Sequence, residues 1–320
     1  MPADEVLDDL DRRIVCALQI DGRAPWRKIA AVIGEPERSV ARRGGDLLAR
    51  GVVSVVGIRP RPSTAVLRLR CQPGMSTTAA EALAQRPDTT FSYVMTGGAD
   101  VVGELASDSD RFAHALGTEL PATTGLVQLV SLPVLHYFRT VRGWSAGALT
   151  QAEAAAMHTD LTGDREADLD FGPVAPQDTT LIGVLIEDGR ASLEAIARRV
   201  GVSETTAARR LEFVLRQHRV EIRAIVEPAV LGLPVEAMLW LTTSPGMVNR
   251  VGQCLAARPQ VRYAAATAGP HQLVADVTVP DMASLYAFIC DEAWAGDIHS
   301  VEASLLLAAR KRGGLILRRG

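Results

Sequence analysis

The stretch Asp21-Gly22-Arg23-Ala24 returns 167 residues later as Asp188-Gly189-Arg190-Ala191, and this repetition decides how the chain folds. Further matches at the same offset are Ile29-Ala30 with Ile196-Ala197 and Ala41-Arg42-Arg43 with Ala208-Arg209-Arg210. A later match, Pro73-Gly74-Met75 with Pro245-Gly246-Met247, has an offset of 172, so the second copy carries five extra residues. Such a period is too long for a solenoid repeat and indicates a duplicated two-domain protein.

The composition is that of a protein with several packed cores and no membrane span. By length, 320 residues favour about two to three domains, whereas the repeat favours four small ones. The chain is 48% hydrophobic, yet no apolar run approaches the roughly 18 residues of a transmembrane helix, and the acidic start does not resemble a signal peptide. Four cysteines without CxxC spacing favour a reducing cytoplasm, and neither a metal site nor a cofactor is predicted.

Each copy begins with three short helices and a strand. In the first copy, apolar spacing predicts helices over 8–20, 25–33 and 36–50 and a strand over 52–56. The corresponding elements of the second copy are helices over 178–187, 192–200 and 203–217 and a strand over 220–226. Gly34 and Gly201 stand between the second and third helices and are expected to break the chain there. The pattern predicts two winged helix-turn-helix domains.

Each copy continues with the strand–helix–strand–strand–helix–strand order of a ferredoxin-like fold. The first copy is predicted as strand 64–72, helix 76–86, strands 90–96 and 100–106, helix 109–119 and strand 125–139. The second is predicted as strand 235–243, helix 246–257, strands 261–268 and 273–279, helix 281–293 and strand 299–310. We therefore expect an α+β protein, a tandem duplication of a winged helix-turn-helix domain and a βαββαβ domain.

The segment 143–176 joins the two copies. Thr150 and Glu153 form a capping-box pattern before an alanine-rich helix at 150–158, and the acidic stretch 159–176 is predicted to be a linker. The expected domains are 1–60, 63–142, 177–228 and 233–320, with 143–176 as helix and linker. Gly143-Trp144-Ser145-Ala146-Gly147 matches the G-x-S-x-G motif, but its preceding strand belongs to the repeat, so Ser145 is not expected to be catalytic.

In this order, the residues resemble the Lrp/AsnC family of bacterial transcription regulators. The matching residues of the first copy are Asp11, Ile14, Leu18, Asp21-Gly22-Arg23, Ile29-Ala30, Gly34, Arg42-Arg43 and Gly51-Val52-Val53. Those of the second are Asp188-Gly189-Arg190, Ile196-Ala197, Gly201-Val202-Ser203, Arg209-Arg210-Leu211 and the hinge Glu227-Pro228, which the first copy lacks. The resemblance covers nearly all of the chain except 143–176. It implies a DNA-binding transcriptional regulator that responds to a small molecule such as an amino acid.

The resemblance also implies that the third helix of each copy contacts the DNA major groove, with arginines on guanine edges or phosphates. The candidate DNA-binding residues are Arg38, Ser39, Arg42, Arg43, Ser203, Thr205, Thr206, Arg209 and Arg210. Residues 36–61 hold six arginines against two acids, whereas residues 178–228 hold eight basic and eight acidic side chains. The second copy is therefore expected to bind DNA less strongly. The alternative is that these are solvated faces, or that one arginine of each pair braces the fold.

Gly44 and Gly45 lie inside the first recognition helix, where family members usually carry an apolar and a long polar residue. Because a glycine inside a helix costs roughly 1 kcal/mol relative to alanine, this helix is expected to be soft until it meets DNA. The soft helix and the neutral second copy also permit a different protein, one that binds no DNA and partners other family members.

The family carries a Thr-Gly-x-x-Asp pattern between the middle strands of its ligand-sensing domain. The candidate ligand-binding residues are Thr96, Gly97, Gly98 and Asp100 in the first copy and Gly269, His271 and Gln272 in the second. Amides of a glycine turn suit a carboxylate and a nearby Asp suits an ammonium group, so the first copy is expected to be the better amino-acid site. The alternative is a plain hairpin turn, in which glycine permits positive φ.

Some tetrapyrrole-processing decarboxylases of the siroheme type share this two-part fold, sometimes as fused halves. The chain resembles them loosely at Ala237-Met238-Leu239-Trp240, but Glu227 stands where they carry a histidine. The sequence therefore predicts a protein that is not an enzyme. The expected partners are double-stranded DNA and a small-molecule effector, with no membrane. We expect the two sensing domains to pair within one chain, and the pseudo-dimeric chain to form a homodimer or higher oligomer.

Overall fold

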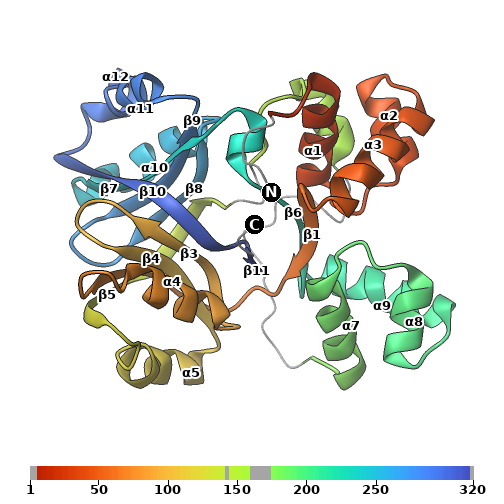
Figure 1. Ribbon diagram of the computed structural model, residues 1–320, viewed down its shortest axis with the longest axis horizontal. Helices are drawn as coiled ribbons and strands as arrows, with labels where there is room; N and C mark the ends of the chain where they lie inside the picture. Colours follow the sequence, from red (N-terminus) through yellow and green to blue (C-terminus); the bar gives the residue numbers. More distant parts are fainter. Residues whose placement is uncertain (1–5, 141–143, 159–173, 318–320) are drawn as a thin grey trace. The chain divides into compact units, whose positions relative to one another are not determined.

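The computed structural model describes residues 6–140, 144–158 and 174–317, and the chain divides into two compact units (Figure 1). One unit contains the helix-turn-helix segments Leu7–Pro60 and Gly147–Glu227. The other contains both αβ segments, which begin at Arg61 and at Pro228. Most of the predicted linker at 159–176, as well as Gly143, lies outside the described residues.

The helix-turn-helix unit contains one arrangement twice. The first copy comprises α1 (Asp9–Ile20), α2 (Trp26–Ile33), α3 (Glu37–Ala49) and β1 (Val53–Ile58), and the second α7 (Pro176–Glu187), α8 (Leu193–Val200), α9 (Glu204–Arg216) and β6 (Glu221–Val226). Gly34 and Gly201 end α2 and α8 in the left-handed conformation, with φ of 72° and 75°. The linking helix α6 (Gln151–Met157) has the predicted capping box between Thr150 and Glu153.

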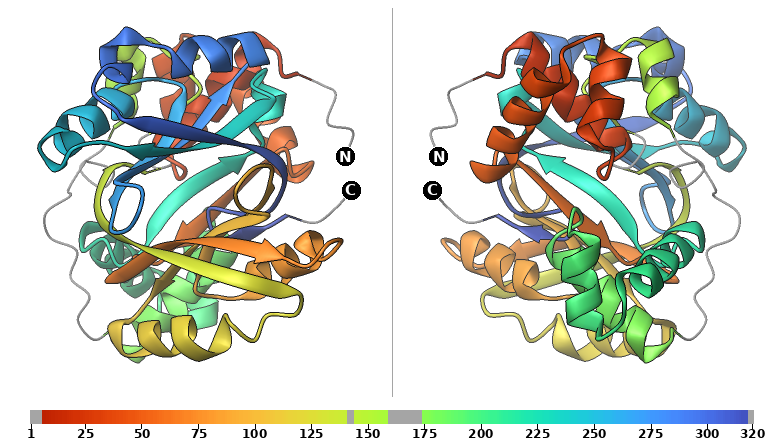
Figure 2. Two further views of the ribbon diagram at one scale, coloured as in Figure 1. Left: turned by 90° about the vertical axis from the view of Figure 1, so that its left-hand side faces the viewer. Right: turned by 90° about the vertical axis from the view of Figure 1, so that its right-hand side faces the viewer.

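The strands β1 and β6 pair with each other as an antiparallel ribbon, with Val53 opposite Val226 (Figure 2). α1 packs against β6 and α7 packs against β1, so the first helix of each copy covers the strand of the other. Gly22 and Gly189 permit this close packing. A Cβ atom would lie 3.0 Å from the Val55 side chain at Gly22 and 2.9 Å from it at Gly189. The two helix-turn-helix copies are therefore one folding unit.

The αβ unit contains the predicted βαββαβ order in each copy. The first copy comprises β2 (Ser63–Cys71), α4 (Ser76–Gln85), β3 (Thr89–Met95), β4 (Val101–Ser107), α5 (Ser109–His114) with a π turn at Ala115–Glu119, and β5 (Leu126–Arg139). The second comprises β7 (Val235–Thr242), α10 (Val248–Ala256), β8 (Val261–Thr267), β9 (Leu273–Val279), α11 (Met282–Ile289), α12 (Glu292–Ala295) and β10 (Ser300–Arg312). The predicted helix at 281–293 is therefore two helices. Short 3-10 turns at Pro228–Leu231 and Pro245–Met247 and the strand β11 (Leu315–Ile316) were not predicted.

The four strands of each copy keep the predicted ferredoxin-like order, β5-β2-β4-β3 and β10-β7-β9-β8. They do not form plain ferredoxin-like domains, however, because the strands of both copies join in one closed β-barrel (Figure 2). Its order is β10-β3-β4-β2-β5-β8-β9-β7 and back to β10, and β11 extends from β10. The long strands β5 and β10 make the closure possible. Ala65–Cys71 of β2 pair with the first part of β5, up to Pro133, and β8 pairs with the part from Val134 to Arg139. β10 likewise pairs first with β7 and then with β3, so that among the described residues each of the eight longer strands has at least two strand partners.

Separate apolar clusters lie outside and inside the barrel. α4 packs on β2 and β4, and α10 and α11 pack on β7, β8 and β9, in two outer cores. The inner cluster is rich in aromatic side chains, including Phe91, Tyr93, Trp240 and Tyr263. Since alternate residues of a strand share a face, the barrel interior is where the two copies meet side chain to side chain.

Candidate functional site

The recognition helices α3 and α9 present polar side chains to solvent. The exposed candidates are Arg38 and Arg42 on α3 and Thr205 and Arg209 on α9. Residues four apart share one face of a helix, so each helix has one exposed polar pair. Ser203 is used locally, since its Oγ caps α9 by accepting from the Thr206 N–H at 3.3 Å and donates to the Thr206 hydroxyl at 3.0 Å. Ser39 is half-buried.

The second arginine of each recognition helix ties that helix to the first helix of its copy. Arg43 Nη1 lies 2.6 Å from Asp8 Oδ2 and 2.9 Å from Asp11 Oδ1. Arg210 Nη1 lies 2.8 Å from Oδ1 of Asp178, the equivalent of Asp11. The Asp11 N–H and Arg43 together lower the pKa of Asp8. Arg43 and Arg210 therefore occupy bracing positions, while Arg42 and Arg209 stay exposed.

The repeated DGR motif joins the two copies. Each DGR arginine donates to two backbone carbonyls of the other copy's turn. The four bonds run from Arg23 to Gly189 (2.5 Å) and Ala191 (3.0 Å), and from Arg190 to Gly22 (2.7 Å) and Ala24 (3.1 Å). Arg190 also stacks on Trp26, with its guanidinium 4.5 Å from the ring centre. Burial lowers the pKa of both arginines. The motif thus holds the two recognition helices in one unit.

The two glycines of α3 have different surroundings. A Cβ atom on Gly44 would lie 2.4 Å from the ring of Trp26, whereas nothing lies within 4 Å of one on Gly45. The helix runs unbroken from Glu37 to Ala49. Gly44 is therefore required by the packing of Trp26, a reason that the local sequence pattern does not show.

Two of the predicted ligand-binding residues in the barrel unit hold their turns. Asp100 Oδ2 accepts from the Cys71 N–H at 2.8 Å, and Gln272 Oε1 accepts from the Thr243 N–H at 3.2 Å. Asp100 and Gln272 are equivalent at the offset of 172, as are Cys71 and Thr243. Both copies thus make the same backbone contact with different side chains, which is the turn role considered as the alternative to ligand binding.

Three further candidates shape these turns. The Thr96 hydroxyl oxygen accepts from the Leu305 N–H at 2.9 Å, which fixes the first turn to β10. Gly97 and Gly269 have φ of 88° and 137°, a region that favours glycine. A Cβ atom on Gly97 would also lie 3.1 Å from the hydroxyl of Ser304. The first turn is thus held against β10, whereas a Cβ atom on Gly269 of the second turn would lie 2.6 Å from the side chain of Leu132 on β5.

The remaining candidates, Gly98 and His271, come from different copies and meet at one ion pair. Arg68 Nη2 lies 2.7 Å from Glu302 Oε1, and the Gly98 N–H donates to the same oxygen at 3.1 Å. His271 Nδ1 lies 3.4 Å from Arg68 Nη1, and His271 Nε2 lies 3.9 Å from Glu302 Oε2. The guanidinium of Arg68 stacks on Trp240 at 4.4 Å from the ring centre. These five residues are called the Arg68–Glu302 cluster; the sequence indicated only Gly98 and His271 as site residues.

Glu104, a buried carboxylate inside the barrel, was not predicted. Its Oε1 accepts from the hydroxyls of Tyr263 at 2.9 Å and Tyr137 at 3.0 Å, and the Thr90 hydroxyl donates to Oε2. Burial raises the pKa of both tyrosines well above the ordinary value, and the charge of Glu104 adds to the shift. Both phenols therefore stay protonated and donate.

The equivalent of Glu104 in the second copy is Asp276, which lies among arginines instead of hydroxyls. Arg262 Nη1 is 3.7 Å from Asp276 and 2.6 Å from Glu236, and Arg312 binds both oxygens of Glu236 at 2.8 and 2.9 Å. Burial raises the pKa of Asp276 to about 6, against the lowering by Arg262. Burial also opposes ionisation of Glu236, but Arg312 and Arg262 lower its pKa on balance. A single acid in each of two matching apolar strands was the signal that could have indicated this pair.

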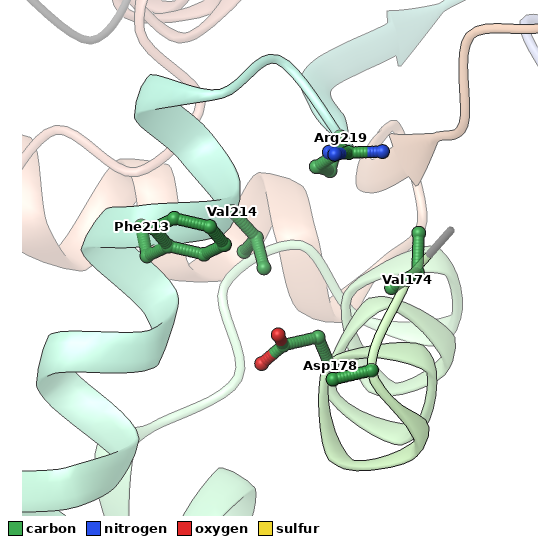
Figure 3. Close-up of a pocket in the computed structure, with 6 residues that line it drawn as sticks. Val174, Asp178, Phe213, Val214 and Arg219 are labelled. Carbon is green, nitrogen blue, oxygen red and sulfur yellow. The ribbon is translucent and has the colours of Figure 1, made fainter. Parts of the chain in front are cut away.

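A small pocket in the helix-turn-helix unit lies between the start of α7 and the end of α9 (Figure 3). It has a volume of about 180 Å³ and is lined by Val174, Ala175, Asp178, Phe213, Val214 and Arg219. Asp178 is the bracing partner of Arg210, and none of the predicted ligand-binding residues lines the pocket. All of the predicted ligand-binding residues lie in the barrel unit instead.

Family models match both kinds of segment. The AsnC-type helix-turn-helix domain matches residues 7–47 and 176–212, which is both copies of the helix-turn-helix. The Lrp/AsnC ligand binding domain matches residues 236–316, in the second αβ segment. An uncharacterised HTH-type transcriptional regulator of Pyrococcus abyssi is 31% identical over 138 residues, which is 42% of this chain and 87% of the relative.

A relative with a different activity is similar over a longer stretch. The siroheme decarboxylase NirDL subunit of Paracoccus denitrificans is 28% identical over 269 residues, which is 80% of this chain and 78% of that protein. A crystal structure of the siroheme decarboxylase NirDL has the same fold, with a TM-score of 0.60 at 12% identity, covering 95% of this chain and 93% of that one. The prediction that the chain is not an enzyme is contradicted by this relative. Within the described ranges, no helix is both long and apolar enough to span a bilayer.

Proposed function

Because the chain belongs to the Lrp/AsnC family, we propose that it is a DNA-binding transcriptional regulator whose two recognition helices act as one fixed pair. The observation that supports this proposal most is the division of labour on α3 and α9. Arg43 and Arg210 are engaged by carboxylates at the first helix of their own copy, while Arg42 and Arg209 remain exposed one position earlier. Exposed arginines on a helix-turn-helix recognition helix have the reach for guanine edges and phosphates.

The contacts of the DGR motif support the proposal that the two recognition helices act as a pair. Four hydrogen bonds between the two turns and the shared β1–β6 ribbon hold both copies in one unit. A dimeric regulator reads two half-sites whose spacing follows from the geometry of its subunits. Here that geometry is set within one chain, so we expect the DNA target to contain two unequal half-sites, in keeping with the basic first copy and the neutral second copy.

The test is a titration of DNA from the region upstream of the protein's own coding sequence, followed by fluorescence anisotropy at several salt concentrations. Changing Arg38 and Arg42 together to alanine should weaken binding and lower the salt slope by about 0.9 for each phosphate that is no longer neutralised. Arg216→Ala is the matched control, since it removes an exposed arginine from the end of α9, away from the half that enters the groove. Equal effects of both changes would contradict the assigned reading face.

We further propose that the regulator responds to a small carboxylate such as an amino acid, bound at the turns around the Arg68–Glu302 cluster. Turn amides and a guanidinium are the groups that recognise carboxylates. In this proposal the chain also assembles as a homodimer or higher oligomer of pseudo-dimers. Light scattering with and without each amino acid tests both parts, since ligand binding to one assembly state shifts the assembly equilibrium.

A second candidate function is supported by the decarboxylase relative, which is similar over both copies of the repeat. In this reading the chain removes carboxyl groups from a tetrapyrrole of the siroheme type inside the barrel unit. The interior holds Arg262 and Arg312, which suit carboxylate side chains, but both are already paired with Glu236. Anaerobic incubation with siroheme, followed by mass spectrometry for the loss of carbon dioxide, decides between the two functions.

A further inference from the structure

The Arg68–Glu302 cluster has the composition of an anion site that is already filled. Glu302 Oε1 receives the Gly98 N–H at 3.1 Å and Arg68 Nη2 at 2.7 Å, and Ser304 Oγ lies 3.5 Å away. An amide N–H and a guanidinium on one carboxylate oxygen are what a bound small carboxylate would receive. Glu302 comes from the second copy, whereas Arg68 and Gly98 come from the first.

The Glu302 carboxylate is the member of the cluster that can be displaced. The Glu302 side chain is 35% exposed, whereas that of Arg68 is only 11% exposed and is held on the ring of Trp240. A Cβ atom on Gly98 would lie 2.5 Å from Glu302 Oε1 and 2.7 Å from Arg68 Nη2, so the glycine is needed for the approach. The receiving groups are therefore fixed, and the group that fills them is the one with access to solvent.

The repeat makes two positions equivalent, and the arrangement of Arg68, Gly98 and Glu302 is found at one of them. At the offset of 172, the counterparts of Arg68, Gly98 and Glu302 are Trp240, Pro270 and Val130. Proline has no N–H and tryptophan has no charge, so the equivalent position cannot bind a carboxylate in this way. Valine has no carboxylate, so no side-chain anion is supplied there either. The site thus depends on the differences between the copies.

We propose that Arg68 and the Gly98 amide form the carboxylate-binding site of the effector, and that Glu302 is a built-in competitor which the effector displaces. The inference rests on the proposed function only in identifying the ligand as the effector. The Glu302 carboxylate is ionised at neutral pH, because the Arg68 hydrogen bond and charge and the Gly98 N–H outweigh the burial that raises its pKa. One carboxylate is then exchanged for another, with no change of charge at Arg68.

The experiment is calorimetric titration of the purified full chain with sodium acetate, at constant ionic strength and without DNA. Glu302→Ala should bind acetate at least about tenfold more tightly than the wild type, because the competitor that occupies most of the site is gone. Acetate should also raise the thermal midpoint of Glu302→Ala more than chloride does. Glu302→Gln should lie between, since a neutral amide is held about half as strongly as a carboxylate.

Two controls make the result decisive. Asp108→Ala removes a carboxylate from an exposed ion pair with Arg61 in the same unit, and should gain no acetate binding. Adding Arg68→Gln to Glu302→Ala should abolish the gained binding. Equal acetate affinity in wild type, Glu302→Ala and Glu302→Gln would overturn the proposal, as would binding that survives Arg68→Gln. Because DNA is absent, a chain that shows the gain but binds no DNA would refute the regulator function and leave this site standing.

Discussion

The roles of the neighbouring arginines on the recognition helices can be separated by four single substitutions. The structure assigns Arg43 and Arg210 to the fold and leaves Arg42 and Arg209 exposed. Alanine at a bracing position should therefore lower stability without changing the salt dependence of DNA binding. Alanine at Arg42 should do the reverse, and Arg209→Ala should resemble it with a smaller decrease in DNA affinity.

The expected magnitudes follow from the burial of the partner carboxylates. Arg210→Ala leaves Asp178, which is 6% exposed, without its cation, so we expect a decrease of about 2 kcal/mol in the free energy of unfolding. For Arg43→Ala the carboxylates of Asp8 and Asp11 are 55% and 18% exposed, so the decrease should be only about 1 kcal/mol. Arg42→Ala should stay within about 0.5 kcal/mol of wild type, as surface changes usually do.

Urea unfolding followed by circular dichroism measures the first quantity, and anisotropy of labelled DNA across a salt series measures the second. Arg42→Ala should lower the salt slope by about 0.9 if the side chain binds one phosphate. The reasoning fails if Arg43→Ala reduces the slope as much as Arg42→Ala does. It also fails if Arg210→Ala is no less stable than Arg209→Ala.

Three further predictions test packing and charge. Gly44→Ala should destabilise the helix-turn-helix unit by about 1–3 kcal/mol, because its methyl group would collide with the Trp26 ring. Gly45→Ala should stabilise the unit by up to about 1 kcal/mol, since nothing lies near the added methyl group. Urea unfolding midpoints that shift in the same direction for both variants would disprove this. Arg23→Ala and Arg190→Ala should each lower the free energy of unfolding by about 2–4 kcal/mol, because each removes two charged hydrogen bonds. Arg199→Ala, which breaks an exposed ion pair, should lower it by at most about 1 kcal/mol. Similar unfolding free energies for all three variants would refute the interlocking role. Burial raises the pKa of Asp276 to about 6, so its contribution to stability is greatest at low pH and is lost as the pH rises through 6. The stability of the wild type relative to Asp276→Asn should therefore fall between pH 4 and pH 8. A difference in stability that stays constant over this range would contradict the raised pKa.

Local chemistry made most of the elements predictable. Gly34 and Gly201 end helices with positive φ, and Thr150 and Glu153 form a capping box, because such motifs involve only a few neighbouring residues. The closed barrel was not predictable in this way. Its closure depends on β5 and β10 each pairing with strands of both copies, and strand partners far apart in sequence leave no local pattern.

The candidate site likewise combines residues that a local sequence pattern reveals with residues that only the tertiary fold brings together. Gly98 and His271 stood in a recognisable turn pattern, but no local motif marked Arg68 or Glu302. Only the barrel brings them together, 2.7 Å apart and 234 residues apart in the chain. Asp100, by contrast, matched the family pattern, and the structure uses one of its oxygens on the Cys71 backbone.

The contact between Arg68 and Trp240 explains why the two copies have to differ for this site to exist. These two residues are equivalent at the offset of 172, and they touch each other, with the guanidinium 4.4 Å from the ring centre. In a symmetric homodimer of one copy, the same place would hold two arginines or two tryptophans. Two guanidinium groups at that distance would repel each other, and two indoles would offer no cation to a carboxylate. Divergence of the copies lets one position carry the cation, Arg68, and its equivalent carry the aromatic ring, Trp240, on which the cation stacks beside Gly98 and Glu302.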